Sequence, residues 1–391
     1  MSWFLQKLPF FEPQHYALAE RLQEWIKANG DILSQHPESN FGGYATEILG
    51  RLSAAGFLDY VLPKTSGAEV TPPDVRSICI IREALTYESF LADSMFTMQG
   101  LGTAPLWHHH DHAMRDATIE ATRQGKRIAA IALTEPDAGS DLAAAQTTAT
   151  LDGDAYVLNG EKAWITNAGI ADQYIVVART GEAPGARGLS AFMVDADAPG
   201  LTITPDVPMI ASHALGSLKF ENCRIPASSI LGGAGTGFKA AMATFDIFRP
   251  SVGGAAVGAA RRAMDETVAR VKTRRMFGKM MAEMDTVQAK IAEMTVDIEA
   301  AALMVYRASW ASDVLGGRVS RESAMAKVMA TEAASRVIDS AVQLFGALGV
   351  ARGSVVEQLY RDIRPTRIYE GASEVQKIVI ARSVLADGDK R

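Results

Sequence analysis

Hydrophobic residues in the first third of the chain recur every three or four positions. Leu18, Leu22 and Ile26 form one such series, which predicts an amphipathic helix. We expect this helix to end at Gly30 in a left-handed turn, because glycine adopts that conformation without steric cost. A helical N-terminal domain is predicted over residues 1–128.

Between residues 129 and 232 the apolar runs become short, and turn residues separate them. Asp152-Gly153 and Asn159-Gly160 are typical of the tight turns that join antiparallel strands. Prolines also disfavour helices in this zone, at Pro199, Pro205, Pro208 and Pro226. The pattern predicts an antiparallel β domain.

The helical period returns over residues 233–391. The apolar seam of one predicted helix consists of Val287, Ile291, Met294, Ile298, Ala301 and Val305. This seam alternates spacings of four and three, as bundle helices do. Because helices, strands and helices follow one another as blocks, we expect an α+β multidomain protein with a C-terminal helical bundle domain.

Charge and cysteine content argue against several classes of partner. The net charge is -6 over 391 residues, and the basic residues are spread along the chain, so we expect no nucleic-acid partner. Cys79 and Cys223 are the two cysteines, which indicates a reducing compartment and predicts a cytoplasmic location. No apolar run has the length of a membrane span, so no membrane partner is expected.

The glycine-rich stretch LGGAGTGF, residues 231–238, invites a dinucleotide-binding interpretation. Phe238 stands where that pattern requires a third glycine, and a long helix without a following strand is predicted next. We therefore favour a loop that enters a helix. An NAD-dependent dehydrogenase is disfavoured for the same reason.

A histidine tract in the first third of the chain could bind metal. It contains His108, His109, His110 and His112. Neighbouring histidines cannot all face one ion, and no cysteine or glutamate with ligand spacing accompanies them. No metal site is expected.

Two polar segments could contact a cofactor. In IALTEPDAGSD, residues 131–141, a proline and a glycine enforce a turn that presents hydroxyl groups and backbone amides; a capped surface turn is an equal alternative. In LNGEKAWITNAG, residues 158–169, Trp164 and Thr166 lie on one face of a strand and could contact a flat ring. By itself, this second segment favours a tryptophan in the core of the β domain.

Five fragments in a fixed order change this picture. They are ALTEPDAGSD, EKAWITNA, RRMFGK, QLFGALG and IYEGASEVQ. Together, and over nearly the whole chain, they resemble the acyl-CoA dehydrogenase family of flavoenzymes. The resemblance implies a helical N-terminal domain, a β-barrel-like middle domain, a C-terminal four-helix bundle, and FAD bound without a Rossmann loop.

The resemblance also implies which residues contact FAD. A first group comprises Leu133, Thr134, Ser140, Trp164, Ile165 and Thr166. In this group Thr134 would bond the pyrimidine side of the flavin, Trp164 would pack on the isoalloxazine ring, and Thr166 would lie by N5. A second group, with which a partner subunit would hold the adenosine diphosphate half, comprises Arg274, Phe277, Gln343, Leu344, Gly346 and Ala347. Ala372 and Glu374 complete the set, and a homo-oligomer, either a dimer or a tetramer, is implied.

Glu370 in RIYEGASEV matches the catalytic base of the family. It would remove the α-proton of an acyl-CoA thioester while the β-hydrogen leaves as hydride to flavin N5, which gives the trans-2-enoyl-CoA. Some members carry the base one position before the arginine of a D-x-x-R pattern, but here that position is Phe248. Substrate contacts are implied for Ser140, Asp246, Arg249, Tyr369 and Gly371. The expected electron acceptor is an electron-transfer flavoprotein.

Several positions depart from the family pattern at expected FAD contacts. They are Met276, Asp285, Ala347 and Ala372. Each alters a polar contact, which predicts weaker FAD binding and the same reaction class. Phe248 makes the expected acyl site bulkier and predicts a short, branched or cyclic acyl group. For Arg249, a charge on the helix surface is the alternative interpretation.

Other functions stay open. The same fold could act on an acyl-carrier-protein thioester, or it could eliminate without oxidation, as an acyl-CoA lyase or desulfinase does. A non-enzymatic helical scaffold or a flavin-binding relic is a different class of protein, and the intact Glu370 argues against it.

Overall fold

The computed structural model describes residues 8–37, 39–66, 69–107, 114–205 and 208–388. The chain forms two compact units, and each unit is assembled from separate segments. Unit 1 is built from Met1–Gln35, Val75–Asp93 and Asp246–Arg391, and unit 2 from His36–Asp74 and Ser94–Phe245. The division into three domains at residues 128 and 232 stays a prediction.

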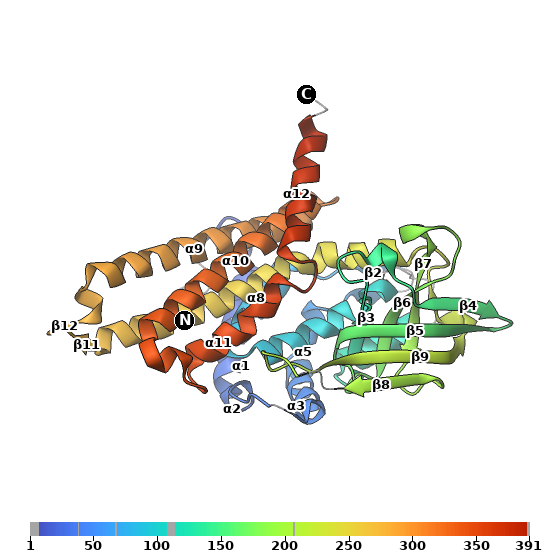
Figure 1. Ribbon diagram of the computed structural model, residues 1–391, viewed down its shortest axis with the longest axis horizontal. Helices are drawn as coiled ribbons and strands as arrows, with labels where there is room; N and C mark the ends of the chain where they lie inside the picture. Colours follow the sequence, from blue (N-terminus) through green and yellow to red (C-terminus); the bar gives the residue numbers. More distant parts are fainter. Residues whose placement is uncertain (1–7, 38, 67–68, 108–113, 206–207, 389–391) are drawn as a thin grey trace. The chain divides into compact units, whose positions relative to one another are not determined.

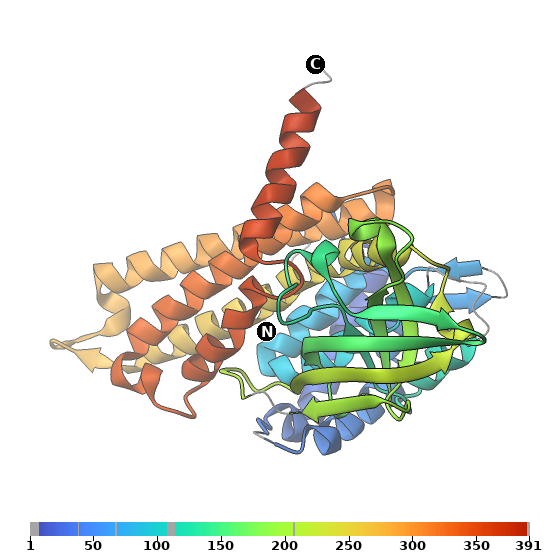
Figure 2. The ribbon, with the colours of Figure 1, turned by 45° about the vertical axis from the view of Figure 1, so that its right-hand side comes forward.

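Unit 1 is helical. It holds α1 (Pro13–Ala28), α2 (Gly30–Leu33), α4 (Val75–Glu88), α9 (Asp285–Trp310), α10 (Ser320–Phe345), α11 (Val355–Ile363), α12 (Ser373–Gly388), and most of α8 (Gly237–Thr273). The predicted seam of α9 is confirmed, with Val287, Met294 and Ile298 buried and Ile291 half-buried. In both ribbon views α8, α9 and α10 lie side by side, while α12 projects away from them (Figures 1 and 2).

Small residues bring α4 and α8 together. A Cβ atom at Gly258 would lie 2.1 Å from the carbonyl oxygen of Glu83, and one at Gly254 would lie 2.8 Å from that of Cys79. The small residues of the stretch SVGGAAVGAA, residues 251–260, therefore allow α8 to pack closely on α4 inside unit 1. Among the described residues, no helix combines the length and the apolar content that a bilayer span requires.

The first helix ends differently from the prediction. α1 stops at Ala28, and the amide of Asn29 donates to the carbonyl oxygens of Trp25 and Ile26 at 3.0 and 3.2 Å. Gly30 has no positive φ; it is the first residue of α2. The left-handed turn was wrong because the chain continues directly into a second short helix, so no reversal is needed.

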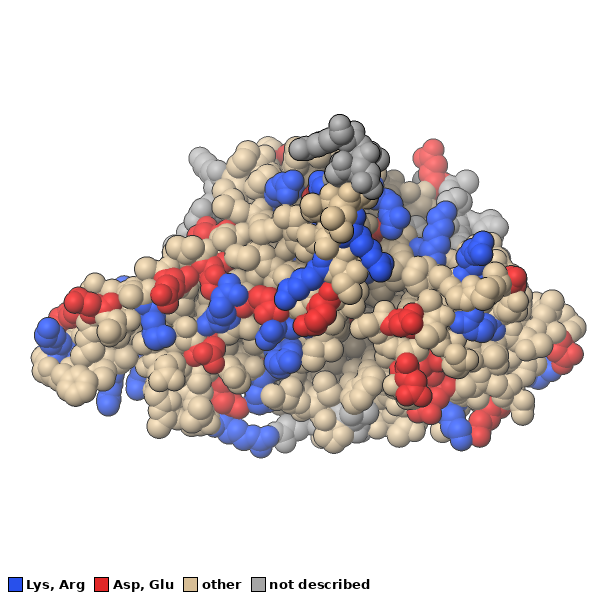
Figure 3. Space-filling view, turned by 45° about the horizontal axis from the view of Figure 1, so that its top comes forward, with Lys and Arg blue, Asp and Glu red and all other residues tan. Residues whose placement is uncertain are grey.

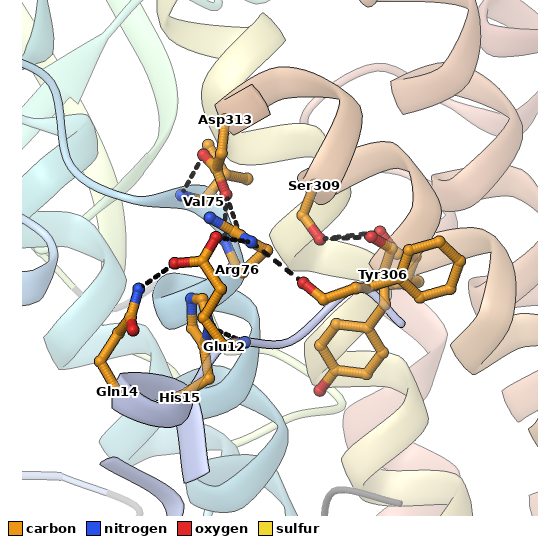
Figure 4. Close-up of polar contacts among 10 residues, drawn as sticks. Glu12, Gln14, His15, Val75, Arg76, Tyr306, Ser309 and Asp313 are labelled. Carbon is orange, nitrogen blue, oxygen red and sulfur yellow. Dashed lines mark hydrogen bonds and ion pairs between the residues drawn. The ribbon is translucent and has the colours of Figure 1, made fainter. Parts of the chain in front are cut away.

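A distant carboxylate caps α4. Both oxygens of Asp313, in the last turn after α9, accept from the backbone amides of Val75 and Arg76 at 2.8 and 3.0 Å (Figure 4). The Arg76 guanidinium donates to Asp313 at 2.9 Å and to the carbonyl oxygen of Phe10 at 3.0 Å. This network ties the N-terminal segment and two helices of unit 1 to one buried charge pair.

Unit 2 contains an eight-stranded sheet. Its strands are β3 (Ala129–Ala132), β4 (Thr148–Asp152), β5 (Ala155–Thr166), β6 (Gln173–Arg179), β7 (Leu189–Asp195), β8 (Leu201–Pro205), β9 (Leu215–Pro226) and β10 (Ile230–Leu231). The order is β10-β7-β6-β4-β5-β9-β8, and β3 pairs with β6. Most pairings are antiparallel as predicted, but β3 and β4 pair with β6 in parallel. α3 (Phe41–Ala54), α6 (Ala104–Trp107), α7 (Arg115–Arg123), most of α5 (Phe90–Leu101), and the hairpin β1 (Lys64–Ser66) and β2 (Glu69–Thr71) also belong to this unit.

The two predicted hairpin turns have different outcomes. Asp152-Gly153 does join β4 to β5, and Gly153 has φ +64°. Asn159-Gly160 instead lies within β5, where the pairing with β9 shifts register between Leu158 and Gly160. A Cβ atom at Gly160 would lie 2.7 Å from the Cα of Thr147, so this glycine permits a bulge and a close approach.

The glycine-rich stretch before α8 is a loop that enters a helix, as predicted. Gly232, Gly233 and Gly235 all have positive φ, and α8 begins at Gly237. On the face drawn in Figure 3, acidic and basic side chains are intermixed.

We expect Asp313→Ala to destabilise unit 1 by about 2–4 kcal/mol, because the change removes a helix cap and takes from the buried Arg76 the more buried of its two carboxylate partners, Asp313 and Glu12. Thermal unfolding should show an earlier transition. Asp297→Ala is the matched control, since Asp297 lies on α9 and pairs with the exposed Arg336 at 2.7 Å; it should cost less than about 1 kcal/mol. Equal shifts in the two variants would contradict the role of the cap.

Candidate active site

Glu370 lies in a tight turn between η8 (Arg364–Arg367) and α12. Its φ is +52° and that of Gly371 is +94°, so two consecutive residues are left-handed. A Cβ atom at position 371 would lie 2.2 Å from Nε2 of Gln376, which explains the glycine. The backbone therefore fixes the direction in which the Glu370 side chain leaves the chain.

Side chains from two helices hold this turn. On α8, Nε of Arg249 donates to the carbonyl oxygen of Glu370 at 3.4 Å. On α10, Nζ of Lys327 donates to the carbonyl oxygens of Tyr369 and Gly371, the latter at 2.5 Å. Every peptide carbonyl around the carboxylate is thus bound by a cationic donor.

Arg82 on α4 brings a third cation. Its guanidinium binds Asp93 in a bidentate pair at 2.9 and 2.8 Å and donates to Oγ of Ser251 at 2.9 Å. The pair is buried, and the positive charge of Arg82 acts on both Tyr369 and Glu370. A fixed charge of this kind favours the ionised form of the neighbouring carboxylate.

Burial raises the pKa of Glu370 above its ordinary value, although Arg82, Lys327 and Arg249 oppose that shift. Oε2 of Glu370 is buried and has no hydrogen-bond partner among the described residues. A desolvated carboxylate with one oxygen that accepts no hydrogen bond is suited to accept a proton. It is the arrangement expected of a general base.

Arg249 is buried, with 7 % of its surface exposed, so the alternative of a helix-surface charge is wrong. It pairs with Asp246 at 3.5 Å, one turn earlier on α8. Asp246 also accepts from Oγ of Ser320 at 3.0 Å. Pro250 cannot donate to the carbonyl oxygen of Asp246 four residues before it, and Oγ of Ser323 reaches that oxygen at 3.4 Å instead.

The alternate base position holds a fully buried phenyl group, Phe248. Among the predicted substrate residues, unit 1 brings Asp246, Arg249, Tyr369 and Gly371 together around Glu370. Ser140 belongs to unit 2 and is exposed. Ala372 and Glu374 follow the turn directly, and Glu374 is exposed at the start of α12.

In unit 2, an ion pair that sequence reasoning missed holds the predicted cofactor loop. Nζ of the buried Lys162 donates to Oε1 of Glu135 at 2.7 Å and to the carbonyl oxygen of Leu133 at 3.0 Å. Glu135 also accepts from the amides of Gln146 and Thr147 at 2.6 and 2.9 Å. Although burial opposes it, these donors hold the pKa of Glu135 below its usual range. Both residues stand inside the quoted fragments, so their opposite charges were the available signal.

Trp164 is 56 % exposed, so the prediction of a tryptophan in the β core was wrong. Its φ is +60°, at a register shift between Lys162 and Ile165. Oγ1 of the half-buried Thr166 lies 3.2 Å from Nε2 of His213, a second residue that sequence reasoning missed. Burial lowers the pKa of His213 to about 4, so its imidazole is neutral at neutral pH. An exposed indole on strained backbone, with a hydroxyl two residues on, fits a planar cofactor such as FAD.

The second group of predicted cofactor residues lies at another place in unit 1. Arg274 and Phe277 belong to the end of α8 and the hairpin of β11 (Arg275–Met276) and β12 (Lys279–Met280), and Phe277 is 89 % exposed at its tip. Leu344 packs on the same apolar cluster as this hairpin. Gln343 lies 16 residues beyond Lys327 on α10, a rise of about 24 Å along a helix axis. Gln343, Gly346 and Ala347 are exposed there, away from Glu370.

The predicted histidine tract, His108–His110 and His112, lies outside the described residues. Elsewhere in the described chain, no three His, Cys, Asp or Glu side chains gather as a metal site.

Two family models match the chain. The model described as "Acyl-CoA dehydrogenase, middle domain" covers residues 130–223, and the one described as "Acyl-CoA dehydrogenase, C-terminal domain" covers residues 235–385. A probable acyl-CoA dehydrogenase of Mycobacterium tuberculosis is 37% identical over 94% of this chain and 93% of its own length. Cyclohexane-1-carbonyl-CoA dehydrogenase of Geobacter metallireducens is 34% identical over 87% of this chain and 90% of its own.

The short-chain specific acyl-CoA dehydrogenase of Homo sapiens is 40% identical over 74% of this chain and 71% of its own length. Among solved structures, butyryl-CoA dehydrogenase from Megasphaera elsdenii has a TM-score of 0.84 at 29% identity, covering 96% of this chain and 99% of that one. The FAD complex of PigA has a TM-score of 0.87 at 28% identity, covering 96% and 98%. The chain therefore belongs to the acyl-CoA dehydrogenase family of flavin-dependent oxidoreductases.

Proposed function

We propose that Glu370 is the general base of an acyl-CoA dehydrogenation that yields a trans-2-enoyl-CoA. The observation that carries this proposal is the desolvated carboxylate with a buried oxygen that has no partner among the described residues. In the reaction the α-carbon gives its proton to Glu370, and the β-carbon loses a hydrogen with its electron pair. FAD, when bound, supplies the acceptor for that hydrogen and those electrons.

Negative charge develops on the thioester oxygen as the α-proton leaves, and fixed donors stabilise such charge. Arg249 and Lys327 bring positive charge to the peptide groups on both sides of Glu370. Glu370 must then hold its new proton on the carboxylate, which burial favours. We propose substrate contacts for Asp246, Arg249, Tyr369, Gly371 and Ser140.

We propose that FAD is the cofactor and that the first group, Leu133, Thr134, Ser140, Trp164, Ile165 and Thr166, holds its flavin. The second group, Arg274, Phe277, Gln343, Leu344, Gly346 and Ala347, would serve a partner copy of the chain, with Ala372 and Glu374 beside the base. Most residues of the second group are exposed, and Gln343 is separated from the Glu370 turn along α10. Both facts support its assignment to a partner copy. Exposed Ile378, Val384 and Leu385 on α12 support a homo-oligomer. We propose an electron-transfer flavoprotein as the acceptor.

The substrate we propose is a short, branched or cyclic acyl-CoA. Support comes from Phe248, a fully buried phenyl group at the alternate base position on α8. Two relatives, named for short-chain and for cyclohexane-1-carbonyl-CoA substrates, point the same way.

Glu370→Gln should lower kcat at least about 100-fold, because the amide cannot accept the α-proton. The flavin content of the purified protein should stay at the wild-type level. Glu357→Gln on α11, where Glu357 pairs with Arg361 at 2.6 Å, is the matched control and should keep full turnover. Anaerobic mixing with acyl-CoAs reads out the step: bleaching of the flavin reports dehydrogenation, and product without bleaching would instead support elimination.

The rate should depend on pH through Glu370. Since its pKa lies above the ordinary 4.5 and the base works ionised, kcat/KM should fall as pH decreases through that raised value. Measurement over about pH 4–9 would show this limb. A rate that stays flat down to the ordinary pKa of a glutamate would contradict the assignment.

A panel of acyl-CoAs should rank short, branched or cyclic chains above long linear ones in kcat/KM. Phe248→Ala should widen the range toward longer chains, since it removes the bulkiest group at the alternate base position. A long linear acyl-CoA as the best substrate of the wild-type protein would rule out this specificity.

A further inference from the structure

Lys327 is a buried cation that contacts the Glu370 turn directly. It lies on α10 with 1 % of its surface exposed. Its Nζ donates to the carbonyl oxygens of Tyr369 and Gly371, and it lies 5.9 Å from the centre of the Tyr369 ring. These two peptide groups flank Glu370 on both sides, so one ammonium holds both ends of the base segment.

The conformation of that segment explains why it needs such a donor. Glu370 and Gly371 are both left-handed, and a left-handed conformation is unfavourable for a non-glycine residue such as Glu370. The two flanking carbonyl groups point toward α10, where apolar side chains would leave them without donors. Gln376 supplies one further bond to the Gly371 oxygen at 3.1 Å. Among the described residues, the donor to the carbonyl oxygen of Tyr369 is Lys327.

Lys327 differs from the other two cations of the site in its ion pairing. Arg82 is matched by Asp93 at 2.8 Å, and Arg249 by Asp246 at 3.5 Å. Within the described part of the chain, Lys327 forms no ion pair with a carboxylate of its own. Its charge is therefore the one least neutralised by a partner, and Glu370 is the carboxylate on which it acts.

We propose that Lys327 is a positioning residue for the base: it fixes the Glu370 turn through the two flanking carbonyl groups, and its charge keeps the carboxylate ionised at working pH. This inference rests on the proposed role of Glu370.

The protonation state of Lys327 predicts a second pH dependence of the rate. Burial lowers its pKa to about 8, while Glu370 opposes the shift and Arg249 adds to it. The charged groups that act on Lys327 are Glu370 in the turn and Arg249 on α8, and the Tyr369 ring lies beside its ammonium. Arg82 and Asp93 act in turn on Glu370. The ammonium is thus present below about pH 8 and is lost above it. An alkaline limb of kcat/KM should follow.

Three variants test the proposal by steady-state kinetics over about pH 5–9 with the flavin-loaded protein. Lys327→Met removes the charge at similar length; kcat should fall about 10- to 100-fold with little change in KM. Its acid limb should move to higher pH, because a cation that favours ionised Glu370 is gone. Lys327→Arg should keep more activity and move the alkaline limb upward, since guanidinium stays charged. Lys377→Met, at an exposed lysine of α12, is the matched control and should match wild type.

A loss of rate in Lys327→Met with both limbs unmoved would indicate a merely structural residue and overturn the proposal. Full activity in that variant would do the same. Should Lys327→Met fail to fold, as circular dichroism would reveal, Lys327→Arg decides alone: an alkaline limb that stays at its wild-type pH overturns the proposal.

Failure of the base assignment looks different. If Glu370→Gln retained turnover, the proposed function would fail whatever Lys327 does. If Glu370→Gln is inactive, adding Lys327→Met to it should cause no further loss, because a positioning residue without its base has nothing to position. An additional tenfold loss in the double variant would overturn the Lys327 inference and leave the base assignment intact.

Discussion

Desolvation of the Glu370 carboxylate is the physical constraint on which the helical unit depends. Removing an ionised carboxylate from water costs several kcal/mol unless nearby charge compensates for it. Three helices each supply one cation: Arg82 from α4, Arg249 from α8 and Lys327 from α10. The same side chains therefore hold the turn against these helices and favour the ionised form of the Glu370 carboxylate.

Comparison with two other buried carboxylates shows how the surroundings of Glu370 differ from theirs. Glu83 binds Arg261 at 3.1 Å and accepts from the hydroxyl of Tyr306, and Glu135 accepts from Lys162 and two backbone amides. Both are saturated with donors, so they hold helices or loops together. Glu370 is surrounded by charge but keeps an oxygen without a donor among the described residues, which leaves it able to take a proton.

The order of helical and strand zones followed from periodicity, and Glu370 was named as the candidate base from the family resemblance of the ordered motifs. Local context defeated the finer predictions. Asn159-Gly160 is typical of a turn, but pairing with β9 makes it a bulge. Gly30 does not form the predicted left-handed turn, because it begins the next helix. Lys327 and His213 gave no signal, because a lone lysine or histidine acquires meaning only from what folding brings beside it. Helical periodicity predicts that a position is buried. It does not predict a lysine there, because the two carbonyl groups that bind Lys327 come from a distant turn of the chain.

The distance along α10 between Lys327 and Gln343 has a consequence for how the protein would behave on dilution. Along that helix Gln343, in the second group of proposed cofactor residues, lies about 24 Å from Lys327, and the proposal assigns this group to the cofactor of a partner copy. In the proposed assembly each copy lends one half to its neighbour, and mass action then links flavin retention to subunit concentration. A dilute sample would lose its colour together with its partner, and concentrating the protein with added FAD would restore both.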